Sequence, residues 1–263
     1  MAAWSIESSR RVEFEEPLTE LEVRLVAGDV VIGATDGPSV LEVSRVVGPA
    51  VEVELVDGRL LVRQRREGMG FSTFGERVSA SLALSVPADC QVDVETVSAS
   101  VLTEGLSSRA LLVTVSGGLI LERLSGPVEA RTVSGAITAR GEAAEFRGKT
   151  VSGSITLDGY LGSAARIESV SGELVADFER AAPDGQVRAD TVSGAVLLRL
   201  PDGASQEVMV KSVSGRLSSA FAELRSKHRP GSRVLKGTLG AGQGRLEVRS
   251  VSGAVSLLRE GAA

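Results

Sequence analysis

The sequence predicts an all-β protein, a single-stranded parallel β-solenoid wound as a right-handed β-helix of about ten rungs. Two observations lead to this prediction. A Val-Ser-Gly tripeptide recurs at intervals of mostly 18–22 residues, and another aliphatic residue follows each of its valines at one fixed distance. Because such periods are typical of repeat architectures, we expect successive repeats to stack on one another and share one core.

The tripeptide marks one corner of each expected rung. It begins at seven valines, after a Val97-Ser98-Ala99 variant: Val115, Val133, Val151, Val170, Val192, Val213 and Val251. Glycine accepts positive φ without a steric cost, so we expect the third residue of each tripeptide to turn the chain. The expected corner residues are Gly117, Gly135, Gly153, Gly172, Gly194, Gly215 and Gly253.

Aliphatic columns flank each corner. Four residues after the valines stand Val101, Leu119, Ile137, Ile155, Leu174, Val196, Leu217 and Val255. Positions three and five before the valines are also mostly apolar, as in Val187 with Ala189, and this two-residue spacing indicates a strand with one buried face. The first set lies an even number of residues from the valine and the second an odd number, so a straight strand would point them to opposite faces. The chain must therefore bend between them to bury both. One rung is therefore a strand, a glycine corner, a second strand and a variable return, with Ile137 stacked on Ile155.

Three regions are expected along the chain. They are residues 1–20, an N-terminal arm or cap; residues 21–91, divergent rungs with a glycine-rich loop at 67–75; and residues 92–258, the regular Val-Ser-Gly solenoid with an insertion at 219–245. The divergent rungs are inferred from Val26-Ala27-Gly28 and Val56-Asp57-Gly58, each followed by an aliphatic residue at the same offset.

The end of the solenoid suggests self-association. The inserted chain contains a basic segment, Arg225–Arg233, which is expected to form a loop. The last rung is followed only by Leu258–Ala263, which is thin cover for unpaired strands. End rungs expose backbone and apolar layers, so end-to-end association is expected.

Outward positions are charged or carry hydroxyl groups. Two residues before the valines, opposite charges are expected to meet between rungs at Lys149 with Glu168 and at Asp190 with Lys211. The Thr and Ser of each Thr-Val-Ser-Gly are expected to satisfy corner backbone groups. The alternative is that both point outward and form an ordered-water or ice-binding ladder.

The search for reactive groups finds little. His228, the only histidine, is expected to be a solvated residue, and Cys90, the only cysteine, a small buried side chain. A zinc site of Cys and His ligands is excluded by count. The Gly240–Gly244 run lacks the following helix that a dinucleotide fingerprint needs. We therefore expect no catalytic, cofactor-binding or metal-binding residues.

An enzymatic alternative remains open. Polysaccharide lyases and hydrolases also use parallel β-helices, and the best candidate cluster here is Glu122, Arg140 and Asp158 in one column. Mutual ion pairing explains their alternating charge better. Aromatic residues make up only 3% of the chain, so platforms that stack on sugars are scarce and carbohydrate is an unlikely partner.

Composition limits the other partners. The net charge is −5 without long runs of one sign, so nucleic acid is not expected to bind. No run of 18 apolar residues occurs, so direct membrane insertion is not expected. The chain start lacks an apolar stretch of signal-peptide length, so we expect a cytoplasmic location.

The reiterated Thr-Val-Ser-Gly, together with the Gly237–Val248 segment, resembles the bacterial putative-adhesin family of β-solenoid domains, over roughly Leu21 to Leu258. This resemblance implies adhesion or surface display, or an assembly scaffold in envelope-stress signalling, and it transfers no catalytic residues. The expected function is a non-enzymatic scaffold or protein-interaction module, with a protein partner or a second copy of the chain bound to its regular faces or inserted loops.

Overall fold

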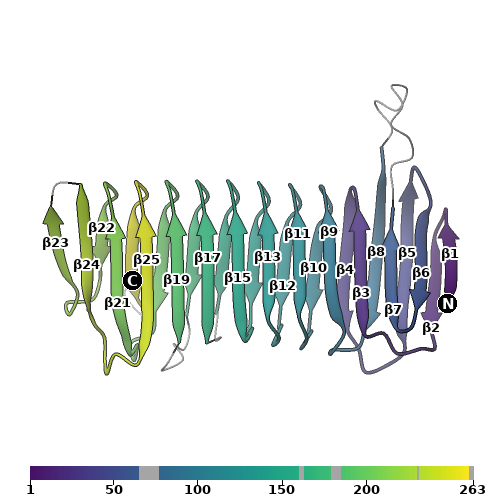
Figure 1. The fold of residues 1–263 in the computed structure, drawn as a ribbon, viewed down its shortest axis with the longest axis horizontal. Helices are drawn as coiled ribbons and strands as arrows, with labels where there is room; N and C mark the ends of the chain where they lie inside the picture. Colours follow the sequence, from purple (N-terminus) through teal and green to yellow (C-terminus); the bar gives the residue numbers. More distant parts are fainter. Residues whose placement is uncertain (65–76, 160–162, 179–184, 230, 261–263) are drawn as a thin grey trace. The chain divides into compact units, whose positions relative to one another are not determined.

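The computed structural model describes residues 1–64, 77–159, 163–178, 185–229 and 231–260. Every regular secondary-structure element of these residues is a β-strand, which confirms the all-β prediction. The chain forms two compact units, Met1–Pro127 and Val128–Ala263, called unit 1 and unit 2. In each unit the strands form two mostly parallel sheets, called sheet A and sheet B (Figure 1).

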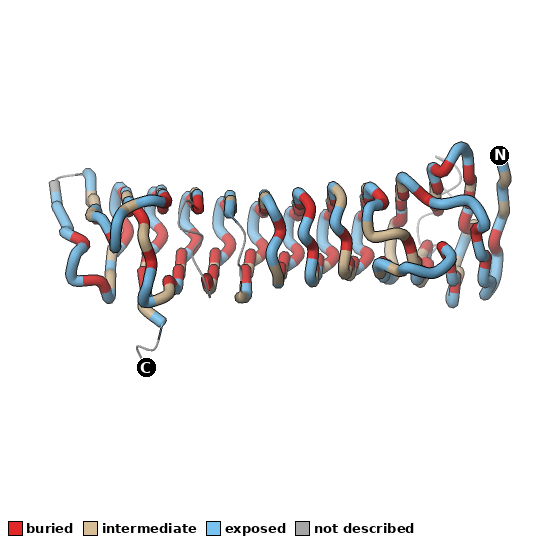
Figure 2. Tube along the Cα trace, turned by 90° about the horizontal axis from the view of Figure 1, so that it is seen from below, coloured by how far each residue is buried: buried red, intermediate tan, exposed pale blue. Residues whose placement is uncertain are grey.

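A regular rung contributes one strand to each sheet. In unit 2, β13 (Val128–Thr132) and β15 (Glu145–Thr150) pair in parallel in sheet A, and β14 (Ile137–Arg140) and β16 (Ile155–Asp158) pair in parallel in sheet B. Ile137 lies opposite Ile155, as predicted, and both are fully buried. Buried and exposed residues alternate along the strands (Figure 2), so the core lies between the two sheets.

The Val-Ser-Gly bend moves the chain from sheet A to sheet B. The threonine or serine before it is buried, the valine and serine are exposed, and the glycine is buried, so two successive residues point outward and the alternation shifts by one. All seven expected glycines lie in such bends. Positive φ, the predicted reason for glycine at these positions, is wrong, because none of the seven is among the described glycines with positive φ.

Close stacking explains these glycines instead. A Cβ added to Gly153 would lie 1.8 Å from the carbonyl oxygen of Gly135 in the neighbouring rung, and one added to Gly172 would lie 1.6 Å from that of Gly153. Gly194, Gly215, Gly253 and Gly117 meet a neighbouring carbonyl in the same way. Glycine is required because each bend rests directly on the backbone of the next.

Among the described residues of unit 1, six strands belong to each sheet. They are β1 (Ala2–Ile6), β2 (Arg10–Phe14), β3 (Glu20–Leu25), β4 (Gly28–Ala34), β5 (Ser39–Val47), β6 (Val51–Val56), β7 (Arg59–Arg63), β8 (Ser79–Val86), β9 (Gln91–Thr96), β10 (Ser100–Glu104), β11 (Ala110–Thr114) and β12 (Leu119–Glu122). Within the unit, sheet A has the order β1-β6-β7-β3-β9-β11 and sheet B the order β2-β5-β8-β4-β10-β12.

The first predicted divergent rung exists and the second does not. Val30 lies opposite Val101 in parallel strands β4 and β10, so Val26-Ala27-Gly28 begins a true rung. Val56-Asp57-Gly58 instead joins β6 to β7 as an antiparallel hairpin in which Val56 lies opposite Arg59. Asp57 and Gly58 have φ values of 49° and 76°, and positive φ at both central residues suits a two-residue hairpin turn.

Antiparallel strands complete one end of unit 1. β1 pairs with β6, and β2 pairs with β5, which in turn pairs antiparallel with β8. Trp4 on β1 and Phe14 on β2 meet edge to face with their ring centroids 5.6 Å apart, so the two sheets close over an aromatic contact. The boundaries of the three predicted regions stay a prediction, and the expected loop at 67–75 lies outside the described residues.

Unit 2 contains the remaining strands. Besides the four above they are β17 (Ala164–Ser169), β18 (Leu174–Asp177), β19 (Gln186–Thr191), β20 (Val196–Leu200), β21 (Gln206–Ser212), β22 (Leu217–Ser219), β23 (Arg225–Arg229), β24 (Ser232–Thr238), β25 (Gly244–Ser250) and β26 (Val255–Arg259). Sheet A of this unit has the order β13-β15-β17-β19-β25-β21-β24-β23, and sheet B has the order β14-β16-β18-β20-β26-β22.

The rungs of unit 2 do not stack in chain order. The last rung, β25 with β26, lies between the rung of β19 and the rung of β21 (Figure 1), and both its strands pair in parallel on each side. The carboxyl-terminal rung is thus internal. The predicted end-to-end association through it loses its basis, because this rung has no open side.

The insertion at 219–245 forms the antiparallel end of sheet A in unit 2. β24 pairs antiparallel with β21, and β23 pairs antiparallel with β24. The predicted loop Arg225–Arg233 is therefore wrong, because this segment forms β23 and the start of β24. Basic residues such as Arg225 and Lys227 on an edge strand discourage pairing with another chain.

Candidate functional site

The bends of unit 2 present a single line of apolar side chains to solvent, here called the valine ridge. Backbone hydrogen bonds between successive bends give its order as Val133, Val151, Val170, Val192, Val251 and Val213. Each of these side chains is between 45% and 51% exposed. Because about half of each side chain stays exposed, the ridge presents apolar surface along its length.

A groove of about 560 Å³ runs beside the valine ridge. Its apolar lining comes from Val151, Val170, Val192 and Val251. Charged residues two positions earlier on the same strands also line it, among them Lys149 and Glu168, which form an ion pair at 3.1 Å between Nζ and Oε2. This pair confirms one predicted cross-rung contact. The groove therefore combines an apolar floor with charges that are matched by neighbours.

The hydroxyl columns behave as corner caps. Thr150 is buried, and its Oγ1 accepts a hydrogen bond from the backbone N–H of Gly153 at 2.9 Å. Thr132 and Thr191 cap Gly135 and Gly194 in the same way. The serine after each valine is exposed and donates to the valine carbonyl of the neighbouring rung, as Ser171 does to Val151 at 3.3 Å. Because Thr132 points inward, the outward double ladder of hydroxyls does not form.

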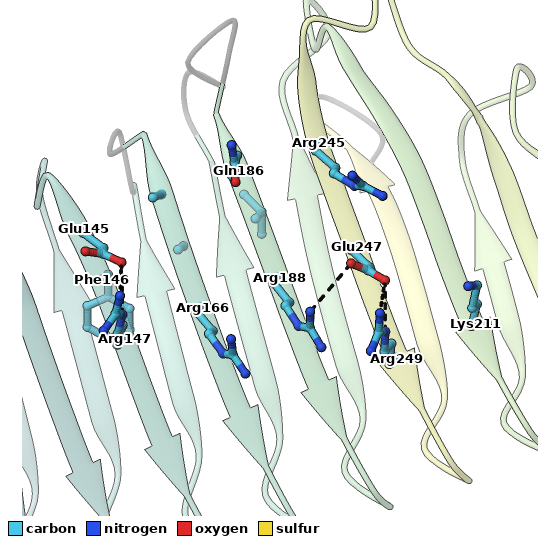
Figure 3. Close-up of a pocket in the computed structure, with 13 residues that line it drawn as sticks. Glu145, Phe146, Arg147, Arg166, Gln186, Arg188, Lys211, Arg245, Glu247 and Arg249 are labelled. Carbon is cyan, nitrogen blue, oxygen red and sulfur yellow. Dashed lines mark hydrogen bonds and ion pairs between the residues drawn. The ribbon is translucent and has the colours of Figure 1, made fainter.

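The outer face of sheet A in unit 2 carries a second groove, of about 610 Å³ (Figure 3). Arg147, Arg166 and Arg188 lie directly opposite one another on β15, β17 and β19. Arg249 on β25 and Lys211 on β21 are also opposite each other. Directly opposed like charges are unfavourable in a sheet, so this face, here called the arginine face, needs nearby carboxylates.

The arginines of this face are paired within their own strands or with the next one. Arg147 Nη2 lies 2.7 Å from Glu145 Oε1, and Arg188 Nε lies 2.7 Å from Asp190 Oδ2. Arg166 pairs with Glu168. The predicted contact of Asp190 with Lys211 is wrong, because the inserted rung places Arg249 opposite Asp190 instead.

Glu247 is the carboxylate shared across the arginine face. It lies 2.6 Å from Arg249 Nη2 and 3.9 Å from Arg188 Nη1 (Figure 3). The hydrogen bond from Arg249 lowers the pKa of Glu247, against a smaller opposing effect of burial. For Glu168, burial acts to raise the pKa, but hydrogen bonds from Arg166 and Lys149 outweigh it and the pKa is lowered. Both carboxylates therefore stay ionised into acid.

Cys90, His228 and the Gly240–Gly244 run each have a structural explanation. Cys90 is buried, and burial together with Asp89 and Glu20 raises its thiol pKa to about 12, so it is an unreactive thiol near neutral pH. His228 is exposed on β23. The Gly240–Gly244 run leads into β25, a strand, and not into the helix that a dinucleotide fingerprint needs.

Two members of the candidate cluster neutralise each other, because Arg140 Nε donates to Asp158 Oδ2 at 2.8 Å. Within the described ranges, no group of three or more His, Cys, Asp or Glu side chains is placed to hold a metal ion.

The two surface features were not recognised from the sequence. The repeated valine is plain in the sequence. The shift in the alternation of buried and exposed residues at the bend indicates that this valine points outward. Arg147, Arg166 and Arg188 stand four residues before successive repeat valines, so their alignment could have been predicted from the period, whereas the position of Arg249 depends on which strand stacks on which. No helix in the described part of the chain has the length and apolar character needed to span a membrane.

Comparison with known proteins places this fold. A family model, Toastrack DUF4097, matches residues 18–258. The chain is similar in structure to a protein described as a putative adhesin from Bacteroides fragilis, with 10% identity over 96% of this chain and 98% of the other and a TM-score of 0.56. The chain is also similar to a second structure described as a putative adhesin, from Parabacteroides distasonis, with 13% identity, 96% coverage of each chain and a TM-score of 0.56.

A third similar structure is described as a putative lipid binding protein from Parabacteroides distasonis, with 14% identity, 96% coverage of each chain and a TM-score of 0.51. At such identities the likeness shows the fold. No curated protein matches the chain. The family match spans nearly all of both units and confirms the resemblance to the bacterial putative-adhesin family. The chain belongs to the Toastrack DUF4097 family.

Proposed function

We propose that the chain is a non-enzymatic protein-interaction module that docks an apolar segment of a partner protein in the groove beside the valine ridge of unit 2. One observation carries this proposal. Every Val-Ser-Gly bend in the unit leaves its valine about half exposed, so the apolar side chains form a continuous line on the surface. Contiguous exposed apolar surface marks interaction sites in soluble proteins.

The surroundings of the ridge favour binding over chemistry. The carboxylates and cations beside it form mutual ion pairs, as between Lys149 and Glu168. The enzymatic alternative requires carboxylates that converge on a cleft, whereas Asp158 is matched by Arg140. A carbohydrate partner is disfavoured because exposed aromatic platforms are scarce, and the ordered-water alternative is disfavoured by the buried Thr132.

The descriptions of similar structures agree with a binding role. Two are described as putative adhesins and one as a putative lipid binding protein, and these words apply to those proteins. For this chain they support an adhesin-like module that acts by binding. Its cytoplasmic location stays a prediction from the sequence.

The finer features of the coil are also proposed. We propose a right-handed coil, because connections between parallel strands of one sheet are right-handed in nearly all known proteins. The count of about ten rungs rests on the Val-Ser-Gly repeats together with the divergent rung at Val26.

The docking proposal is tested by making the valine ridge less apolar without changing its shape. The variant Val151→Thr, Val170→Thr, Val192→Thr keeps β-branched side chains of similar volume and replaces one methyl group of each by a hydroxyl. The matched control, Val31→Thr, Val56→Thr, Ile120→Thr, changes apolar residues of similar exposure in unit 1. All three proteins are used for affinity capture from a lysate of the native host.

The wild type and the control are expected to recover the same protein partner, and the ridge variant is expected to lose it. Equal recovery by the ridge variant would refute the proposal. Deletion of residues 219–245 is a poor alternative, because it removes β23 and β24 and leaves β21 unpaired on one side.

A further inference from the structure

The two strands that end the sheets of unit 1 pair on one side only among the described strands. β1 pairs with β6 in sheet A, and β2 pairs with β5 in sheet B (Figure 1). In an antiparallel pair, the backbone N–H and C=O groups of alternate residues point away from the partner strand. Each of these edges therefore offers a row of hydrogen-bonding groups to which a further strand can be added.

The side chains of β1 do nothing to discourage such an addition. Proteins usually protect an edge strand with charged side chains or proline, or keep it very short. β23, the edge of sheet A in unit 2, carries Arg225 and Lys227, and β22, the edge of sheet B there, has only three residues. β1 has five residues, Ala2–Ile6, and none of them is charged or a proline. Among the described edge strands, β1 is therefore the least protected.

The core of unit 1 is also incompletely covered at β1. Trp4 lies opposite the buried Val53, so its side chain is on the inner face of sheet A. It contacts Phe14 of sheet B but stays partly exposed, and no described strand lies beyond β1 to cover it. An open backbone edge next to a partly exposed indole favours a partner that supplies both a strand and apolar surface.

A second copy of β1 fits this edge in the antiparallel orientation. With a twofold axis at Trp4, all five residues of the strand find a partner. Trp4 then lies opposite Trp4 of the second copy, Ala3 opposite Ser5, and Ala2 opposite Ile6. Inward side chains meet inward side chains, the small exposed ones meet outside, and no like charges are opposed.

The same twofold axis, perpendicular to the sheets, brings β2 next to its counterpart. Arg11 and Glu13 flank the buried Val12 and are exposed on the outer side of this strand. An antiparallel arrangement around Val12 sets Arg11 of each copy opposite Glu13 of the other, so this edge is complementary to itself. These charges favour one register, whereas the paired backbone and the covered aromatic rings supply the affinity.

We propose that the chain forms a twofold-symmetric dimer in which β1 of each copy pairs antiparallel with β1 of the other. Sheet A then continues across the contact, and the two Trp4 side chains become buried. This inference does not depend on the valine ridge, which belongs to unit 2. It also differs from the end-to-end association expected from the sequence, which used the carboxyl-terminal rung. The other possible occupant of the edge, an extended segment of a different protein, is separated by the experiment below.

Sedimentation velocity and tryptophan fluorescence of the full chain test the dimer. Trp4 is the only tryptophan, so its emission reports on this edge alone. With rising protein concentration, the sedimentation coefficient is expected to increase from the monomer value to the dimer value. The emission maximum is expected to move to shorter wavelength in parallel, as the indole loses contact with water. A chain that stays monomeric up to its solubility limit overturns the proposal, even if β1 binds another protein.

Charges placed on the edge identify the contact. The variant Ala3→Lys, Ser5→Lys changes two exposed positions that oppose each other in the dimer, so lysine meets lysine and the dissociation constant is expected to rise at least about tenfold. The matched control, Ala83→Lys with Ser81→Lys, makes the same changes two residues apart on β8, which is paired on both sides. This control is expected to dimerise like the wild type. Circular dichroism and the melting temperature establish that each variant is folded.

Mixing two oppositely charged variants is the decisive arm. Ala3→Glu with Ser5→Glu is expected to be as weak a dimer as the lysine variant. An equal mixture of the two is expected to regain the dimer, because each introduced lysine then lies opposite an introduced glutamate. A mixture that stays monomeric, or a β8 control that fails like the β1 variant, overturns the proposal.

Discussion

The repeat glycines are required by the closeness of neighbouring bends. A methyl group at Gly172 would lie 1.6 Å from the carbonyl oxygen of Gly153, a contact that only backbone movement can relieve. We expect Gly172→Ala to lower the free energy of unfolding by about 3 kcal/mol or more, because the strain falls on two stacked bends. Urea unfolding followed by circular dichroism measures the change.

Gly203 provides the control for this substitution. A Cβ at Gly203 meets no atom within 4 Å and its φ is not positive, so Gly203→Ala is expected to be neutral or slightly stabilising. Similar destabilisation by both substitutions would show that loss of glycine flexibility matters, and not the contact with the neighbouring carbonyl.

The buried hydroxyls make a separable contribution. Thr150→Val keeps the shape of the side chain but leaves the buried N–H of Gly153 without its acceptor. The expected loss is about 1–3 kcal/mol, the cost of an unsatisfied buried donor. Thr150→Ser retains the hydroxyl, as Ser212 does before Gly215, and is expected to recover most of the loss. Equal loss in both variants would contradict the capping role.

Asp93 links stability to pH. Because folding raises its pKa above the ordinary value of 3.8, the folded chain binds the carboxyl proton of Asp93 more tightly than the unfolded chain does. The resulting stabilisation is present below pH 3.8 and is lost as the pH rises through the raised value. We therefore expect Asp93→Asn to melt at a higher temperature than the wild type at pH 7, with the difference shrinking in acid. The exposed Asp29→Asn is the control, and a lower melting temperature for Asp93→Asn at pH 7 would contradict the expectation.

At the scale of elements, the position of β25 has a measurable consequence. This strand pairs with β19 on one side and β21 on the other, whereas β23, among the described strands, pairs only with β24. Amide groups of β25 are expected to exchange hydrogen at least about a hundredfold more slowly than those of β23, because edge strands open locally and internal strands open with the core. Equal exchange rates, measured by mass spectrometry, would contradict the observed rung order.

The sequence predicted the rung but not the order of rungs. Alternating burial and the parity shift at Val-Ser-Gly are local properties, so the stacking of Ile137 on Ile155 followed from spacing alone. The insertion of β25 between β19 and β21 is not local. Every rung presents the same aliphatic columns, so the pattern does not say which neighbour a rung selects.

Two hairpins were missed for different reasons. The Asp57-Gly58 pair is a strong signal for a two-residue hairpin, but the aliphatic residue at the repeat offset suggested a rung. β23 carries charged and polar side chains on an edge strand, so it lacks the alternating apolar residues by which a strand is recognised.

At the scale of the whole molecule, each rung is hydrogen-bonded only to its neighbours, so the effect of a core defect is expected to spread along the stack and weaken with distance. Ile155 is fully buried between Ile137 and Leu174, and Ile155→Ala is expected to cost about 2–5 kcal/mol. Ile120 is 42% exposed on a strand of sheet B in unit 1, and Ile120→Ala is expected to cost less than about 1 kcal/mol.

Hydrogen exchange on the Ile155→Ala variant shows how far the defect reaches. Faster exchange is expected in β14, β16 and β18, the strands that hold Ile155 and its two neighbours in register. Strands β4 and β8 of unit 1 pair with each other and make no contact with Ile155 through these registers, so their exchange is expected to change little. Uniform acceleration across both units would show that the chain unfolds as one cooperative block, and that nearest-neighbour stacking does not set its stability.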